Sequence, residues 1–298
     1  MRLNLLIPFF VFALLISCKK ETTVDRYVEK TVDDNSFDSP EWVTENEIRN
    51  FVYRLSLDLV GNQPDTAWIA SKTQELKAAD FTKEAKAAVA RELVADPGFR
   101  HHFYQLTTDR LLDGVGRVGV TATLMEYRAV LAQFEANNQE LEAQLFREEV
   151  AKMEALLVAD SMFLDAGALD FNTYVRPFLF NGIYDNINMG AENFVVACYQ
   201  HVYGRYPTTY ELEQAKLMVD GGNGQLYSQS GNSKTDFLSI FASSPEYLSG
   251  NVRWLELVWL RGYLGDDEHW YIVDQYQSNA NIEELIVSIV VSAKYEEL

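Results

Sequence analysis

Cysteine and histidine are scarce in this chain, which limits the chemistry it can carry. Its 298 residues include two cysteines, Cys18 and Cys198, and four histidines. If the Cys18 thiol is covalently modified, Cys198 has no second cysteine with which to form an intramolecular disulfide. Cys198 lies in an apolar helical pattern, which is typical of a small buried hydrophobic residue. From the sequence we therefore predict no catalytic residue, no metal and no cofactor.

Basic residues are also in short supply. The chain has 25 Lys and Arg against 44 Asp and Glu, a net charge of −19. Removing residues 1–17, which contain one base and no acid, gives 24 − 44 = −20. Such acidity argues against nucleic acid and against anionic lipid as partners. We interpret the acidity as a source of solubility, with an acidic interaction surface as the alternative.

Long apolar runs are missing except near the start of the chain. Leu3 to Ile16 is apolar apart from one asparagine, and this run is shorter than the ~20 residues that span a bilayer. It ends in Leu15-Ile16-Ser17-Cys18, which resembles a bacterial lipobox. The resemblance implies a signal peptide over residues 1–17 and a lipid on Cys18. An uncleaved anchor helix with an incidental cysteine is the alternative.

A lipid on Cys18 implies a protein anchored at the bacterial outer membrane, because the resemblance is to lipoproteins of that membrane. Two or more acyl chains give stable anchoring. Residues 18–40 are rich in charged and hydroxyl side chains, which predicts a flexible tether that holds the body roughly 25 Å from the membrane. Lys19-Lys20-Glu21 mixes both signs of charge, so the periplasmic and the surface-facing side both stay open.

From residue 41 onward, apolar residues recur at helical spacing. Thr44 and Glu47 form a possible capping box, and Gly61 ends the helix that they begin. The apolar face of this helix carries Ile48, Phe51, Val52, Leu55 and Leu59. No sustained alternation of apolar and polar residues indicates a sheet. We predict an all-α fold, a multi-helix bundle.

Residues 121–193 form the central part of the chain. Residues 121–160 carry the longest helical pattern, which predicts either one long helix or a helical hairpin that turns at Asn137-Asn138. Residues 161–193 are the least regular and indicate a structured connection. Because functional residues concentrate on ordered loops over a rigid scaffold, we expect a binding surface where Asp170–Glu192 meets the helices that follow.

Two blocks, residues 41–120 and 194–298, share a pattern of glycines that end helices and prolines that begin them. Identical residues recur at five positions with an offset of 143 (194 − 51). They are Phe51 and Phe194, Val52 and Val195, Gly61 and Gly204, Pro64 and Pro207, and Thr66 and Thr209. At an offset of 148 (244 − 96), Ser244-Pro245-Glu246-Tyr247 repeats the pattern of Asp96-Pro97-Gly98-Phe99. An ancient duplication accounts for these matches, although any helical bundle uses Gly stops and Pro starts.

The second block resembles a known group of modules. The residues that carry the resemblance are Phe194 to Leu248, with Val202-Tyr203-Gly204-Arg205-Tyr206-Pro207-Thr208, Glu211 and Phe241-Ala242-Ser243-Ser244-Pro245-Glu246-Tyr247-Leu248. They are similar to small all-helical modules of unknown function in secreted bacterial proteins, and Arg54 to Pro64 with Asp96-Pro97 resembles a companion module. Some of these modules stand beside c-type cytochrome domains, but this chain has no Cys-x-x-Cys-His for covalent haem. The resemblance implies an all-α fold and supplies no catalytic residue.

Each candidate chemical site has a plainer explanation. His101 and His102 are neighbours on a predicted helix and point about 100° apart, so they cannot readily chelate one ion. Asp220–Gly224 lacks the spaced acidic ligands of a calcium loop and indicates a flexible connection. Asp266–His269 is typical of a helix start. A glycan platform is the alternative to core packing for five aromatic residues, Trp254, Trp259, Trp270, Tyr271 and Tyr276.

The function that these observations favour is a membrane-anchored lipoprotein that binds or scaffolds an envelope protein without catalysing a reaction. A glycan- or nutrient-binding lipoprotein is the second hypothesis. An uncharacterised envelope enzyme is the third. The expected partners are the membrane, through the lipid on Cys18, and an envelope protein; a glycan stays open and nucleic acid is not expected.

Overall fold

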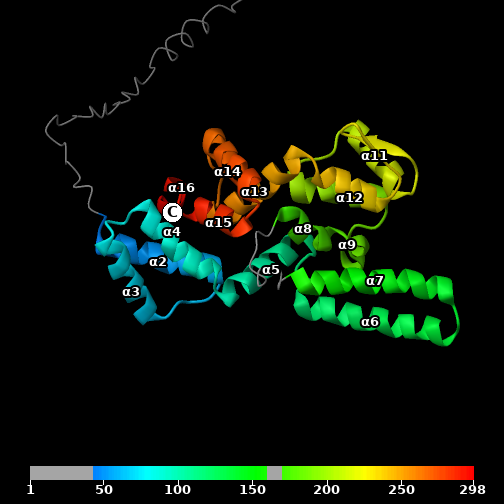
Figure 1. Cartoon of the computed structure of the whole chain (residues 1–298), viewed down its shortest axis with the longest axis horizontal. Coiled ribbons are helices and arrows are strands. Elements are labelled where there is room, and N and C mark those ends of the chain that lie inside the picture. Colours follow the sequence, from blue (N-terminus) through cyan, green and yellow to red (C-terminus); the bar gives the residue numbers. More distant parts are fainter. Residues whose placement is uncertain (1–42, 160–169) are drawn as a thin grey trace, which may run out of the picture. The chain divides into compact units, whose positions relative to one another are not determined.

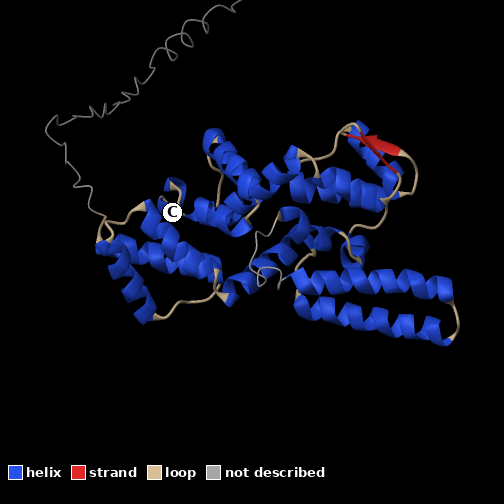
Figure 2. Ribbon diagram, viewed as in Figure 1, coloured by secondary structure: helices blue, strands red, loops and turns tan. Residues whose placement is uncertain are grey.

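The computed structural model describes residues 43–159 and 170–298. Within these residues the chain forms fifteen α-helices, one π-helical turn and one two-stranded hairpin, which confirms the predicted all-α, multi-helix fold (Figure 2). The predicted signal peptide, the lipidation site Cys18 and the tether lie outside the described residues.

The first block is a run of four helices, each begun by a side-chain cap. The helices are α2 (Glu45–Val60), α3 (Thr66–Ala78), α4 (Lys83–Val94) and α5 (Pro97–Leu111). Thr44 and Glu47 form the predicted capping box, and Gly61 ends α2 in the left-handed conformation, with φ 76°. Asp96 caps α5, in which Pro97 occupies the first turn, where its missing N–H costs nothing.

The central part of the chain is a helical hairpin, one of the two arrangements that the sequence predicts. Its helices are α6 (Arg117–Ala136) and α7 (Glu140–Val158), and the turn between them contains Asn138 at φ 55°. Asparagine tolerates this left-handed conformation better than most residues, which explains the break in the helical pattern. Helix α7 packs against the following helices, whereas α6 lies on its far side (Figure 1).

The segment after this hairpin is more regular than we expected. Where the sequence indicates an irregular connection, the structure has α8 (Phe171–Leu179) and α9 (Gly182–Ile187). Asp170 and Asn181 cap these two helices, so asparagine and aspartate mark helix starts here rather than a loop.

The second block repeats the helix order of the first. Its elements are α10 (Ala191–Cys198), the π-helical turn η2 (Tyr199–Tyr203), α11 (Thr209–Val219), β1 (Gly224–Leu226), β2 (Gln229–Gly231), α12 (Lys234–Ala242) and α13 (Pro245–Leu260). Gly204 ends η2 at φ 70°, and Ser244 caps α13 with Pro245 in its first turn. The predicted connection Asp220–Gly224 runs into β1. A Cβ on Gly224 would lie 2.3 Å from the carbonyl oxygen of Gln214, so only glycine fits there.

Three further helices end the chain, and the last two of them pack against the first block. They are α14 (Asp266–Asn279), α15 (Ile282–Val290) and α16 (Ala293–Glu296). The Arg54 guanidinium donates to the carbonyl oxygen of Tyr295, 2.6 Å away, and Arg91 forms two hydrogen bonds with Glu284. The C-terminal helices therefore complete the core of the first block, since α4 and α15 are also in contact.

Candidate functional site

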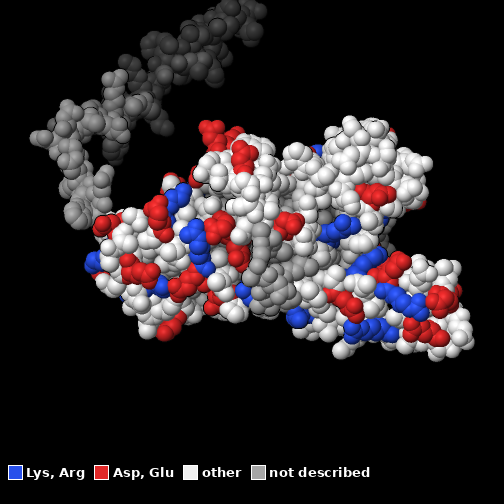
Figure 3. All heavy atoms as spheres, in the orientation of Figure 1, with Lys and Arg blue, Asp and Glu red and all other residues white. Residues whose placement is uncertain are grey.

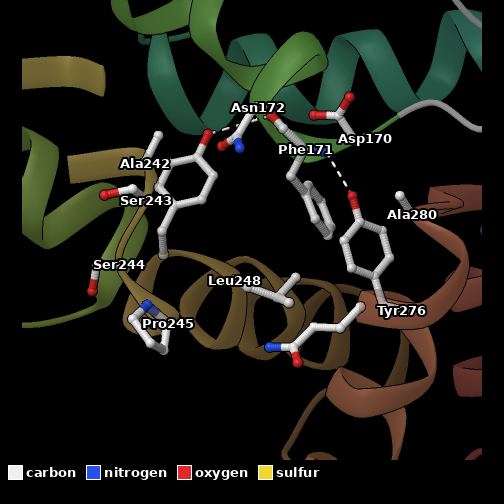
Figure 4. Close-up of a pocket in the computed structure, with 12 residues that line it drawn as sticks. Asp170, Phe171, Asn172, Ala242, Ser243, Ser244, Pro245, Leu248, Tyr276 and Ala280 are labelled. Carbon is white, nitrogen blue, oxygen red and sulfur yellow. Dashed lines mark hydrogen bonds between the residues drawn. The ribbon is translucent and has the colours of Figure 1, made fainter. Parts of the chain in front are cut away.

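An open pocket of about 430 Å³ lies where α8, the α12–α13 junction and α14 meet (Figure 4). Its volume is in the range of small-ligand sites. It falls between the Asp170–Glu192 segment and the second block, where the sequence suggests a binding surface. The residues that line it are Asp170, Phe171, Asn172, Ala242, Ser243, Ser244, Pro245, Tyr247, Leu248, Tyr276, Gln277 and Ala280.

Two buried tyrosines fix the wall of this pocket by binding the backbone of one residue. The Phe171 amide donates to the Tyr276 hydroxyl at 2.7 Å, and the Tyr247 hydroxyl donates to the Phe171 carbonyl oxygen at 3.3 Å. Burial raises the pKa of both phenols, so both stay protonated at neutral pH. The start of α8 is thereby held against α13 and α14.

Several polar side chains of the pocket are already used as helix caps, and two amides are not. Asp170 accepts from the Thr173 amide at 2.9 Å, and Ser244 accepts from the Glu246 amide at 3.2 Å. By contrast, Asn172 and Gln277 are exposed and make no side-chain hydrogen bond within residues 43–159 and 170–298. An amide both donates and accepts, so these two groups can bind a polar ligand.

A second cavity of about 160 Å³ adjoins the first along α8. The two cavities share Asn172, Ala242 and Tyr247, and the second is also lined by Arg176. We call the two together the α8 groove. Among the described residues that line it, the only formal charges are Asp170 in the larger cavity and Arg176 in the smaller one.

A serine, a histidine and a glutamate form a hydrogen-bonded line between α13 and α14 that the sequence pattern does not reveal. The Ser249 hydroxyl lies 2.8 Å from Nε2 of His269, and Nδ1 of His269 lies 2.6 Å from a carboxylate oxygen of Glu256. These distances match those of a nucleophile, a base and an orienting carboxylate. The signal available in the sequence is the spacing of Ser249 and Glu256, seven residues apart on one helix face.

The surroundings of this line favour a structural role. His269 is 1% exposed and Glu256 is fully buried. The Glu256 carboxylate also accepts from Arg253 at 2.9 Å and from the Leu264 amide at 3.3 Å, so it ties together the two ends of the α13–α14 turn. Ser249 lines neither cavity of the α8 groove. The predicted helix start Asp266–His269 is confirmed, and His269 is its inward-facing residue.

The other histidines lie apart from one another. His101 is exposed, whereas His102 is partly buried beside Gly61 and burial lowers its pKa. His201 lies 3.1 Å from the Tyr184 hydroxyl, and burial lowers its pKa as well. In the part of the chain that the structure describes, no three His, Cys, Asp or Glu side chains are grouped so that they could bind a metal ion.

Cys198 is fully buried, as the helical pattern predicts. Burial raises the pKa of its thiol to about 12, although a contact with the Tyr184 hydroxyl acts in the opposite direction. The thiolate is therefore not formed at neutral pH, and Cys198 is an inert core residue.

The five aromatic residues considered for a glycan platform divide between core and surface. Trp259 and Tyr276 are buried, and Trp254 packs against Phe103 with its ring centroid 5.8 Å away, so core packing is confirmed for these three. Trp270 and Tyr271 are exposed, at 49% and 62%.

The α6–α7 hairpin exposes the largest group of apolar side chains on a single motif of the described chain. Two lie on α6, Val118 at 86% and Met125 at 65%, and Leu141 on α7 is 71% exposed. Ala122, Ala129, Ala132 and Ala136 continue the α6 stripe at intervals of three and four residues. Leu145 and Val158 are the other exposed apolar residues of α7. We call this group the hairpin surface.

Charged side chains of both signs are intermixed on the α6–α7 hairpin (Figure 3). Arg128 binds Glu154 at 2.6 Å, and Arg147 binds Glu135 and Glu140 at 3.0 and 2.9 Å. This mixture of signs supports the interpretation of the acidity as general solubility rather than as one acidic patch.

The chain matches no protein-family model, no curated protein and no solved structure. Residue roles therefore come from the geometry alone, and the resemblance of residues 194–248 to small helical modules stays a prediction. Across residues 43–159 and 170–298, every helix is too short or too polar to cross a bilayer.

Proposed function

We propose that this protein is a lipid-anchored component of the bacterial outer membrane that binds or scaffolds an envelope protein without catalysing a reaction. The lipobox resemblance at Leu15–Cys18 supports the lipid anchor, and the predicted tether would let the anchored body reach a partner away from the membrane surface. The hairpin surface is the single observation that carries the binding role.

The hairpin surface has the chemistry of a protein contact. Its apolar residues lie on two adjoining helices, and on α6 they face away from α7, because the side chains packed toward α7 belong to the opposite stripe, which includes Val120 and Leu124. Exposed apolar side chains rimmed by charged residues, as on the α6 stripe, are typical of interaction sites on soluble proteins. Helical partners commonly recognise such stripes through residues at three- and four-residue intervals.

A change of Cys18 tests the anchor. Cys18→Ala removes the acylation site, so we expect the protein to move from the membrane fraction to the soluble fraction. Cys198→Ala is the matched control and should leave the distribution unchanged. A Cys18→Ala protein that still sediments with membranes after a high-salt wash would contradict the lipid anchor.

Two charge substitutions test the binding role. The wild-type protein should recover its partner from detergent-solubilised envelopes in a pull-down. The double variant Met125→Glu, Leu141→Glu should fold normally and fail to recover that partner. Gln133→Glu adds one charge to the same hairpin at a polar position and serves as the control. Equal recovery of the same partner by all three proteins would place the contact elsewhere.

Glycan binding is the second candidate function, favoured by the exposed pair Trp270 and Tyr271. Exposed aromatic rings offer apolar area with little conformational entropy to lose. Asp266, one turn before Trp270, holds Arg253 at 2.9 Å and adds polar groups nearby. A glycan array read with the wild type and Trp270→Ala separates the two functions, because only glycan binding predicts signals that the substitution removes.

A further inference from the structure

The α8 groove carries opposite charges at its two ends. Asp170 lies at the start of α8 and Arg176 lies six residues later, which is about 9 Å along a helix axis. Arg176 is exposed and forms no ion pair within residues 43–159 and 170–298, so its charge is open to a ligand. We propose that the groove binds a short peptide with its free amine at Asp170 and its free carboxylate at Arg176. This inference concerns a different site from the hairpin surface and goes beyond the proposed function.

The spacing of Asp170 and Arg176 along α8 sets the scale of the ligand. An extended peptide spans about 3.3–3.6 Å per residue, so about three residues match the ~9 Å rise along α8 from Asp170 to Arg176. The two cavities, of about 430 and 160 Å³, share Asn172, Ala242 and Tyr247 in their linings. The ligand therefore runs along α8, with most of its volume in the larger cavity.

The groups between the charges suit a peptide backbone. The Asn172 amide has no side-chain partner among the described residues and can both donate to a peptide carbonyl and accept from a peptide N–H. Gln277 offers a second free amide across the larger cavity. The ring of Tyr247, which lines both cavities, supplies apolar contact for side chains.

Asp170 can bind an amine without giving up its role as helix cap. One carboxylate oxygen accepts from the Thr173 amide at 2.9 Å and the other accepts from the Thr173 hydroxyl at 2.7 Å. Each carboxylate oxygen has a second lone pair, so an ammonium group can still be bound. Arg176 presents a planar fork of donors, which fits a terminal carboxylate.

The same charges argue against other small ligands. No Lys or Arg is among the described residues that line the larger cavity, so the charged group that an anion would meet from these residues is the Asp170 carboxylate. A neutral sugar would leave Asp170 and Arg176 without counterions. A zwitterion is the class of small ligand that satisfies both ends.

Calorimetric titration of the purified chain with trialanine tests the proposal. We expect saturable millimolar binding, and about fivefold weaker binding of N-acetyl-trialanine and of trialanine amide, because each lacks one exposed ion pair. Asp170→Asn keeps a good N-cap residue, and it should bind the free and the acetylated peptide equally. Arg176→Gln should bind the free and the amidated peptide equally.

The pairing of each blocked peptide with one variant keeps the test independent of protein stability and of the envelope partner. Circular dichroism of both variants establishes that they fold. No saturable heat with trialanine at about 10 mM would overturn the proposal. Equal binding of all three peptides by the wild type would also overturn it, as would tighter binding of a neutral disaccharide. None of these outcomes affects the anchor or the hairpin surface.

Discussion

The first and second helical blocks share a frame and differ in what is added to it. In both, a helix ends at a left-handed glycine, Gly61 or Gly204, and a second helix follows from a capping residue. In both, the fourth helix starts with a capped proline. The second block also contains a group of ion pairs after Gly204, which we call the ionic clamp, a β-hairpin and the wall of a pocket. The first block has no counterpart of these three features among its described residues.

The clamp shows this difference most clearly. After Gly204, the Arg205 guanidinium binds the carboxylates of Glu211 and Glu246, with both hydrogen bonds to Glu211 at 2.8 Å. After Gly61 comes Asn62, which is exposed. The helix junction also differs, because a Cβ on Gly98 would lie 2.6 Å from the Val60 side chain. The α4–α5 junction of the first block is therefore filled by the Val60 side chain. The matching α12–α13 junction of the second block is open and lines the α8 groove.

The largest effect should come from Gly250, where α13 crosses η2. A Cβ there would lie 2.0 Å from the Val202 carbonyl oxygen, so the backbone must move to accept it. Gly250→Ala should lower the free energy of unfolding by about 3 kcal/mol, measured by urea denaturation. Gly265→Ala is the control and should cost less than about 1 kcal/mol, because Gly265 is an N-cap residue with no atom within 4 Å of the added Cβ and a φ of −59°. A Gly250→Ala protein as stable as the control would mean that the two elements are not in this contact.

Arg205→Gln should have the next largest effect. It leaves the carboxylate of Glu211, 8% exposed, without its cation, so we expect a loss of about 2 kcal/mol in the free energy of unfolding. Asn62→Ala, at the matching position of the first block, should change it by less than about 0.5 kcal/mol. Similar losses in both variants would remove the distinction between the blocks.

The pH dependence of stability sharpens the same contrast. Burial acts to raise the pKa of Glu211, but hydrogen bonds from Arg205, Thr208 and Tyr227 outweigh it and lower the pKa from 4.5 to about 2. A folded-state pKa below the unfolded value stabilises the protein above pH 4.5, and this contribution is lost as the pH falls toward 2. The stability gap between wild type and Arg205→Gln should therefore shrink over that interval, as measured by thermal unfolding. A constant gap would exclude Glu211 as the cause.

The smallest effect should be at Ser249. Because His269 is nearly inaccessible and Glu256 is held by Arg253, we expect no covalent labelling of Ser249 by a fluorophosphonate probe, read by mass spectrometry. Ser249→Ala removes one hydrogen bond and should cost about 1 kcal/mol. Labelling of the wild type that disappears in both Ser249→Ala and His269→Gln would favour the enzyme hypothesis instead.

The sequence predicts the frame of this protein better than its sites, and particular residues show why. Thr44, Gly61 and Pro97 act within one or two helical turns, so their roles can be inferred from local pattern. The left-handed turn at Asn138 is also a local effect, which explains why the hairpin was one of the two predicted arrangements. Asp170 was less clear, because a cap and a loop residue look alike until the helix after it is known.

The sites depend on residues far apart in the chain, which pattern analysis does not join. Phe171 meets Tyr276 across 105 positions, and Arg54 meets Tyr295 across 241. The line from Ser249 to Glu256 needs His269 from the next helix, whose orientation the sequence does not fix. The sequence also does not show which side chains are exposed. Trp259 and Trp270 look equivalent in the sequence, but only Trp259 is buried.

Photo-crosslinking from the hairpin surface tests the central claim most directly. A benzophenone amino acid at Met125, in cells that make the full-length protein, should crosslink one envelope protein when irradiated. The same residue at Glu84, exposed on α4 in the first block, should not crosslink that protein. Recovery of one shared partner from Met125 and not from Glu84 is the result that we predict. Identical crosslinking patterns at both positions, or none at Met125, would contradict a binding role for this surface.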